Sequence, residues 1–161
     1  MKHAPALLLS TVLALVAACE STSSNPATSE PDPEGTGPKE TQANAPLEDT
    51  EWLLVEVGGK PAIPGVGTRK ASVSFGSDSG SVSGNSGLNS FFGPYAVDRA
   101  KLRIENLGMT RMGGSPELME QETAFTAALH AARSWSVRGN SLELHDEKGV
   151  AIARLRTAAD S

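Results

Sequence analysis

The sequence predicts an α+β domain: a strongly curved antiparallel sheet, or partial β-barrel, of about eight strands closed by one helix. Two patterns favour this class. Short segments with alternating apolar residues recur between turns rich in glycine, asparagine and aspartate, which is typical of antiparallel strands. One longer segment, roughly Pro116 to Arg133, places its apolar residues at helical spacing instead.

The first strands lie ahead of the most glycine-rich part of the chain. Trp52–Val57 is expected to begin the domain as a strand that ends at a glycine pair, and residues 60–68 form a loop. Ala71–Phe75 alternates strictly, so one of its faces should be buried. After a turn, Ser81–Ser83 is expected to start the returning strand.

The chain is organised around Gly84–Tyr95, which combines glycines with two asparagines and three of the chain's seven Phe, Trp and Tyr residues. Glycine, and after it asparagine, adopts the positive φ that tight bends require at the lowest cost. Phe91, Phe92 and Tyr95 have far more apolar surface than a solvated linker needs, so at least one should insert into the core. The stretch is therefore expected to be a structured corner between two strands.

The second half of the domain is expected to contain the helix between two groups of strands. Tyr95–Val97 and Leu102–Ile104 should pair, and an irregular segment follows them. Ser115 is a suitable helix cap with Pro116 at the first helical position. The buried helix face is predicted to hold Leu118, Phe125, Leu129 and Ala132, with Glu122 at its margin. A terminal meander of three strands is expected at Trp135–Val137, Leu142–Leu144 and 150–155.

Residues 1–18 have the layout of a lipoprotein signal peptide. A short positive end that contains Lys2 precedes an uncharged, mostly apolar run that ends at Ala18, and the next residue is Cys19, the chain's one cysteine. The run is shorter than the hydrocarbon thickness of a bilayer, so a signal peptide is favoured over the alternative of a permanent transmembrane helix. Val16–Cys19 resembles the bacterial lipobox, which implies a diacylglyceryl group on Cys19 and, in many bacteria, an added acyl chain such as palmitate. The alternative is an ordinary cleaved signal with an incidental cysteine.

Residues 19–50 are expected to form the lipid anchor and a disordered acidic linker. Glu20–Thr50 holds seven acidic residues and one lysine, and Leu47 is its main apolar side chain besides alanine. Such a segment cannot bury enough surface to offset the entropy of ordering. Residues 51–161 hold twelve acidic and twelve basic residues, so the domain is neutral and nucleic acid is not an expected partner.

Several motifs follow one another along the domain in an order that resembles a known family. They are Trp52-Leu53-Leu54, Val82-Ser83-Gly84 with Gly87 and Asn89, Gly93-Pro94-Tyr95, Met109-Thr110-Arg111-Met112, Met119-Glu120-Gln121-Glu122 with Phe125 and Leu129, and Leu142-Glu143-Leu144. Together they resemble the META or HslJ-like domain of bacterial envelope proteins and kinetoplastid virulence factors. The resemblance runs from Trp52 to about Arg156 and places the domain at residues 51–158.

One departure from the family pattern predicts a contact. The family usually carries a cysteine in the corner and another before the helix, and these positions are Leu88 and Gly114 here. Because both cysteines are absent together, the corner and the pre-helix loop are expected to touch, with Leu88 filling space in place of a disulfide. The predicted structural corner consists of Gly84, Gly87, Leu88, Asn89, Gly93 and Gly114.

Few residues are spaced as a catalytic or metal site requires. The mature chain holds only His130 and His145, neither in a zinc-binding motif, and no serine lies in a G-x-S-x-G elbow. No catalytic residue, metal or cofactor is therefore predicted. Arg111 and Asn89 are the candidate ligand-facing residues: the Arg111 guanidinium can bind an anionic group, and Asn89 is expected beside it. The alternative is a surface arginine, or one that satisfies loop carbonyls.

These observations favour a non-catalytic, lipid-anchored protein of the cell envelope. The outer membrane, facing the periplasm, is the favoured location and the inner membrane the alternative. The resemblance implies an accessory role in envelope stress, drug tolerance or secretion, with an envelope protein or an acyl chain as ligand and the membrane bound through Cys19. The domain is expected to be monomeric. The alternative function is a periplasmic hydrolase of cell-wall or drug substrates that uses a serine with His130 or His145.

Overall fold

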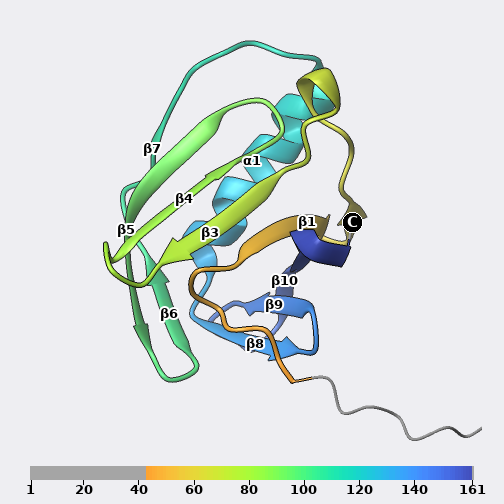
Figure 1. Ribbon diagram of the computed structural model, residues 1–161. Coiled ribbons are helices and arrows are strands. Elements are labelled where there is room, and N and C mark those ends of the chain that lie inside the picture. Colours follow the sequence, from red (N-terminus) through yellow and green to blue (C-terminus); the bar gives the residue numbers. More distant parts are fainter. Residues whose placement is uncertain (1–42, 161) are drawn as a thin grey trace, which may run out of the picture. The chain divides into compact units, whose positions relative to one another are not determined.

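A computed structural model describes residues 43–160 of the chain (Figure 1). The predicted signal peptide, the lipidation site at Cys19 and the linker up to residue 42 lie outside the described residues. In chain order the elements are β1 (Glu51–Val57), β2 (Lys60–Pro61), the 3-10 turn η1 (Val66–Thr68), β3 (Ser72–Gly76), β4 (Ser81–Asn85), β5 (Ser90–Asp98), β6 (Lys101–Ile104), β7 (Gly108–Met109), α1 (Pro116–Ala131), β8 (Ser134–Arg138), β9 (Ser141–His145), β10 (Ala151–Thr157) and η2 (Ala158–Asp160).

Eight antiparallel strands form a closed barrel, in the order β1-β3-β4-β5-β6-β8-β9-β10. The barrel closes because β10 pairs back onto β1, from Trp52 opposite Thr157 to Val57 opposite Ala153. The expected class and strand number are therefore confirmed, but the sheet is not a partial barrel. The two short strands are additions, since β2 pairs with β1 and β7 pairs with β5. Closure was not predictable from alternation alone, because it depends on pairing between the two ends of the domain.

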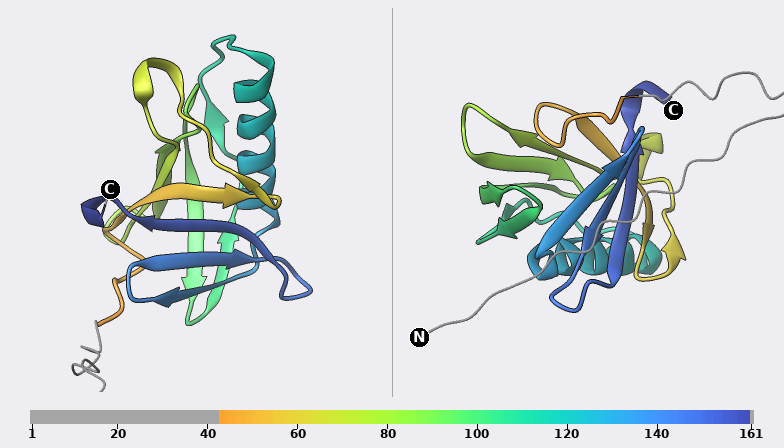
Figure 2. Two further views of the ribbon diagram at one scale, coloured as in Figure 1. Left: turned by 90° about the vertical axis from the view of Figure 1, so that its right-hand side faces the viewer. Right: turned by 90° about the horizontal axis from the view of Figure 1, so that it is seen from below.

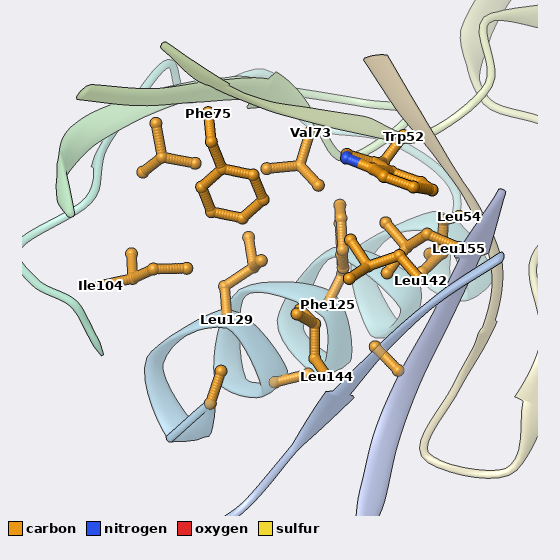
Figure 3. Packing of buried hydrophobic residues seen from close by; sticks show 14 of the residues in the cluster. Trp52, Leu54, Val73, Phe75, Ile104, Phe125, Leu129, Leu142, Leu144 and Leu155 are labelled. Carbon is orange, nitrogen blue, oxygen red and sulfur yellow. The ribbon is translucent and has the colours of Figure 1, made fainter. Parts of the chain in front are cut away.

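The core lies between the barrel wall and α1, which Figure 2 shows lying along one side of the strands. Phe125 and Leu129 of the helix are fully buried and meet side chains from the strands in the interior (Figure 3). Phe91 of β5 packs edge-on against Phe125, with ring centroids 5.8 Å apart. Leu118, which was expected on the buried face, is only half-buried. Gln121 occupies the face instead and is 7% exposed.

The helix begins and ends as its capping residues require. The Ser115 hydroxyl accepts a hydrogen bond from the Leu118 N–H at 3.4 Å, which confirms it as the N-cap. The helix ends at Ala131, two residues before the predicted end, because Ala132 adopts an extended ψ of 131°. The Arg133 guanidinium then donates to the carbonyls of His130 and Ala132, both at 2.8 Å, which satisfies groups that the helix leaves open.

The predicted corner is shorter than expected, because strands continue into it from both sides. Only 86–89 forms the turn, which we call the corner turn, while Gly84 belongs to β4 and Gly93 to β5. Gly84 is required by close packing, since a Cβ there would lie 2.5 Å from Cζ of Phe91. Phe91 is fully inside the core at 2% exposure and Tyr95 packs against the core, whereas Phe92 is 69% exposed.

The ordered domain begins before residue 51, which corrects the linker boundary. Residues 44–49, which we call the N-terminal strap, cross one end of the barrel. At one side the Ala45 N–H donates to the Gly139 carbonyl, and at the other the Asp49 N–H donates to the Phe75 carbonyl. Leu47 is 4% exposed, and its carbonyl accepts a hydrogen bond from the Trp52 indole at 2.9 Å. The strap is thus held by one buried leucine and by hydrogen bonds at both of its ends.

Candidate functional site

The corner turn lies at the end of the barrel opposite the strap and connects three other segments. Its own shape is fixed locally: the Asn85 side-chain oxygen accepts from the Gly87 N–H at 2.7 Å, and the Ser86 N–H donates to the Asn89 carbonyl at 2.8 Å. Gly87 has a φ of 92°, which a residue with a side chain rarely adopts. Asparagine and glycine at these positions therefore specify a rigid turn whose remaining polar groups point at neighbouring segments.

Asn89 holds the pre-helix loop against the corner turn. Its side-chain oxygen accepts from the Thr110 hydroxyl at 2.9 Å and the Met112 N–H at 2.7 Å. Its amide nitrogen donates to the Met112 carbonyl and to the Glu122 carboxylate, both at 3.1 Å. The residue is 2% exposed and all four of its hydrogen-bonding positions are occupied. Asn89 therefore positions the loop and has no group left for a ligand, which corrects the expectation that it faces one.

Ser86 and Glu122 connect the corner turn to the helix. The Ser86 hydroxyl lies 2.5 Å from Glu122 Oε2 and donates to it, while the N–H of Asn89 donates to the same hydroxyl at 2.9 Å. A serine beside a carboxylate resembles the start of a nucleophilic site. Ser86 is fully buried, however, and its oxygen already accepts a backbone hydrogen bond. The pair therefore fastens α1 to the turn.

Gln121 fastens the loop after β2 to the same place. Its side-chain oxygen accepts from the Ile63 N–H at 2.7 Å, and its nitrogen donates to the carbonyls of Ile63 and Ser86 at 3.2 and 3.3 Å. Next to it, the Val66 N–H donates to the Gly87 carbonyl at 2.9 Å. Gln121 was not predicted as a site residue. The available signal was a polar residue at a buried position of the helix, which requires satisfied partners.

The expected contact between the corner and the pre-helix loop is present. A Cβ added to Gly114 would lie 2.8 Å from Cδ1 of Leu88, and Leu88 itself is 1% exposed. The two positions that carry cysteines in the family pattern are therefore neighbours in space. Leu88 occupies the volume between them, so apolar packing takes the place that a disulfide would have.

Beside the corner turn, a hollow of about 630 Å³ opens between β7 and the pre-helix loop. Arg111 and Met112 line it together with Asn89 and Glu122. Arg111 is exposed, and no hydrogen bond or ion pair connects its guanidinium to another group of residues 43–160. Met112 is 52% exposed. The ring of the exposed Phe92 lies against Gly108, which is one of the residues that line this hollow.

The histidines lie away from this hollow. His130 is exposed in the last helical turn, as its position predicted. The imidazole Nε2 of His145 lies 3.5 Å from the Glu143 carboxylate. Within residues 43–160 no hydrogen bond connects a serine hydroxyl to either imidazole, so the hydrolase alternative gains no support from these contacts. The described residues contain no group of three or more His, Cys, Asp or Glu side chains placed to hold a metal ion.

Two smaller hollows flank Ile63 on the outside of the barrel. One of about 230 Å³ lies between the β1–β2 hairpin and α1, and one of about 310 Å³ lies between β1 and the loop of residues 62–71. Sites for small molecules typically reach about 300–1,000 Å³. The hollow beside the helix is thus too small to enclose a whole acyl chain. It gives the acyl-ligand expectation no support.

Comparisons with known proteins agree on the family and the fold. The profile of the META domain matches residues 45–159. An NMR structure of a protein 26% identical to this chain covers 70% of it and 92% of its own length, with a TM-score of 0.56. A second NMR structure, of a protein from Burkholderia xenovorans, is 24% identical and covers 85% of this chain and 99% of its own, also with a TM-score of 0.56. No curated protein sequence matches the chain.

Proposed function

Because the chain belongs to the META domain family, we propose that it is a non-catalytic binding module, held at the cell envelope by a lipid on Cys19. It acts by contact with another envelope protein, as an accessory factor in envelope stress, drug tolerance or secretion. The outer membrane, facing the periplasm, is the favoured location. No helix among residues 43–160 has the length and hydrophobicity of a membrane-spanning segment.

The observation that carries the binding proposal is the surface formed by Arg111, Met112 and Phe92, which we call the Arg111 face. It combines a guanidinium that has no partner among residues 43–160 with two exposed apolar side chains: Met112, which lines the hollow, and Phe92, which lies against Gly108 of the lining. Arginine, methionine and aromatic residues are the types enriched at the centres of protein interfaces. The hydrogen bonds of Asn89 hold the backbone beneath this face rigid, so little ordering cost remains for binding. A partner that presents a carboxylate beside an apolar side chain fits it.

The binding proposal is tested by crosslinking in cells that produce the full-length chain. A photo-crosslinking amino acid at Met112 should capture one partner protein, which mass spectrometry then identifies. Arg111→Glu should weaken binding of that purified partner by about tenfold or more, as loss of a central charged contact does. Arg138→Glu is the matched control, since Arg138 is also exposed but lies on β8. The proposal is contradicted if the crosslinker captures no partner, or if Arg111→Glu and Arg138→Glu bind the purified partner equally well.

The anchor is tested separately. The protein extracted from membranes should carry a diacylglyceryl group on Cys19, visible by mass spectrometry of its N-terminal peptide. Cys19→Ser should release the protein from the membrane fraction, because a chain without acyl groups loses most of its affinity for lipid. An unmodified Cys19 in the mature protein would remove the anchor from the proposal and leave the binding face untouched.

A further inference from the structure

A second surface, on the opposite side of Ile63 from the helix, has a different composition from the Arg111 face. It is the hollow of about 310 Å³ between β1 and the loop of residues 62–71, which we call the β1 groove. Its lining is aliphatic, and its two charged residues, Lys70 and Arg156, are both cations. Arg69, next to Lys70 in the chain, is exposed as well.

A bulge in β1 causes the apolar exposure at this groove. The pairing of β1 with β10 shifts between Leu54 and Glu56, so no residue of β10 lies opposite Val55. Val55 is 44% exposed, and Ile63 across the groove is 39% exposed. Leu53 forms the floor at 8% exposure. A solvent-facing polar residue would serve the bulge equally well, so the aliphatic side chains call for another explanation.

The backbone around the groove leaves little for a peptide to bind. The Val55 carbonyl accepts from the Ala62 N–H at 2.8 Å, and the Ala71 carbonyl accepts from the Leu54 N–H at 2.8 Å. Both backbone groups of Ile63 are bound by Gln121. A peptide that adds to a sheet needs a free strand edge, and no aromatic side chain lines the groove to anchor one otherwise. A protein partner is therefore disfavoured here.

Exposed aliphatic side chains with cations beside them and no anion in the lining are typical of a surface that rests on anionic lipid. The side chains enter the boundary between headgroups and acyl chains, and each nearby Lys or Arg adds attraction to negative headgroups. We propose that the β1 groove docks the domain onto the surface of a bilayer that contains anionic phospholipids. This contact is independent of the Arg111 face, and it does not require a lipid on Cys19.

The test uses the full mature chain with Cys19→Ser, so that acyl groups cannot mask the contact. Its binding is measured by sedimentation with vesicles of phosphatidylcholine alone or with about one-third phosphatidylglycerol. Binding should be stronger to the anionic vesicles and should fall as salt rises. Lys70→Glu should weaken it by about 25-fold, because the reversal changes the charge by two units and each unit contributes about fivefold. Ile63→Ser should weaken it by about fivefold through lost apolar burial.

Two exposed residues in the β9–β10 turn region provide matched controls. Lys148→Glu repeats the charge reversal, and Val150→Ser replaces an aliphatic side chain that is 56% exposed. Neither should change vesicle binding, and circular dichroism should report the same fold for all four variants. Equal binding to both kinds of vesicle, or equal losses in the controls, would overturn the proposal. Binding of a soluble fatty acid without binding of vesicles would also overturn it, and would assign the groove to a free amphiphile.

Discussion

Asn89 is the residue on which the corner turn most depends. Its four hydrogen bonds connect Thr110, Met112 and Glu122 to the turn, and its own side chain is buried at 2% exposure. Replacing it removes four hydrogen bonds at once and leaves the partly buried groups that they join without these partners, which adds a desolvation cost to the loss of the bonds. The sequence predicts that this asparagine matters, because of its place in the glycine-rich corner. It does not predict the partners, which come from positions 21 to 33 residues away.

Asn89→Ala should lower the free energy of unfolding by about 2–4 kcal/mol, which denaturant titration of the full mature chain measures. Thr123→Ala is the control: this exposed hydroxyl bonds only to a carbonyl of its own helix, so its loss should cost less than about 0.5 kcal/mol. A loss for Asn89→Ala no larger than that of the control would contradict the role given to the network.

Two glycines provide a second comparison at this scale. A Cβ at Gly65 would overlap the carbonyl of Gly87, which is backbone and cannot rotate away, whereas a Cβ at Gly113 would meet nothing within 4 Å. Gly65→Ala should therefore destabilise the chain by about 2–3 kcal/mol or displace the loop, and Gly113→Ala should change stability by less than about 0.5 kcal/mol. Thermal unfolding of both variants measures the difference. Similar unfolding midpoints for the two variants would mean that the loop can move to accommodate the added methyl group without loss of stability.

Tyr95 should respond to alkali in a way that reports on the strap. Burial raises the pKa of its phenol, and the Glu48 carboxylate, which accepts its hydrogen bond, raises this pKa further. The unfolded chain therefore releases the proton near pH 10 while the folded chain keeps it, so stability should fall as pH rises above about 10. Tyr95 is the one tyrosine of the chain, so tyrosinate absorbance follows it alone. Glu48→Gln should lower this pKa without restoring the ordinary value, because burial remains.

At the scale of elements, local sequence patterns predicted the positions of the strands and the helix better than the contacts between them. The alternating strands, the Ser115 cap and the helix start at Pro116 follow from short-range chemistry, and the structure confirms them. The corner was predicted at the correct place but with too many residues. Gly84 and Gly93 were assigned to the turn because they are glycines, whereas they lie in β4 and β5 and are needed there for close packing. Gln121 was missed, since its partners lie in a loop whose path the sequence does not specify.

The neighbouring positions 88 and 114 allow an element-scale test. In a chain with Cys19→Ser, the pair Leu88→Cys and Gly114→Cys should form a disulfide, since the two side-chain positions are in contact. Closing this loop should stabilise the oxidised form by about 3–4 kcal/mol relative to the reduced form, by the chain-entropy estimate. Denaturant titration with and without a reducing agent measures the gain. If the thiols stay reduced under air, the two loops do not approach as closely as the packing requires.

At the scale of the whole domain, the two ends of the barrel have different roles. The N-terminal strap closes one end, and the chain leads from it towards residue 42. The corner turn and the Arg111 face lie at the other end, where β4 runs into β5. The proposed binding face and the strap are therefore at opposite ends of the barrel. The sequence could not predict this arrangement, because it depends on barrel closure and on the burial of Leu47. A single leucine in a polar segment gives no sequence signal that it is buried.

The strap should contribute to the stability of the whole domain. Leu47→Ala should cost about 2–3 kcal/mol of unfolding free energy, because it opens a cavity against Trp52 at the end of the barrel. The control Val150→Ala removes an exposed side chain and should cost less than about 0.5 kcal/mol. Both losses of unfolding free energy are measured by denaturant titration. Equal losses in the two variants would mean that Leu47 does not stabilise the domain and belongs to the linker.

The ring of strands has one narrow junction. β6 and β8 share a single register pair, Lys101 opposite Ser134, flanked by one hydrogen bond on each side. Every other neighbouring pair in the ring is held over three or more positions. Local opening of the barrel should therefore start at this junction. In a hydrogen-exchange experiment, the amide protons of Leu102 and Trp135 should exchange with solvent sooner than those of the β1–β10 junction. Opening of the barrel is thus expected to begin between β6 and β8 and to spread from there to the neighbouring strand pairs.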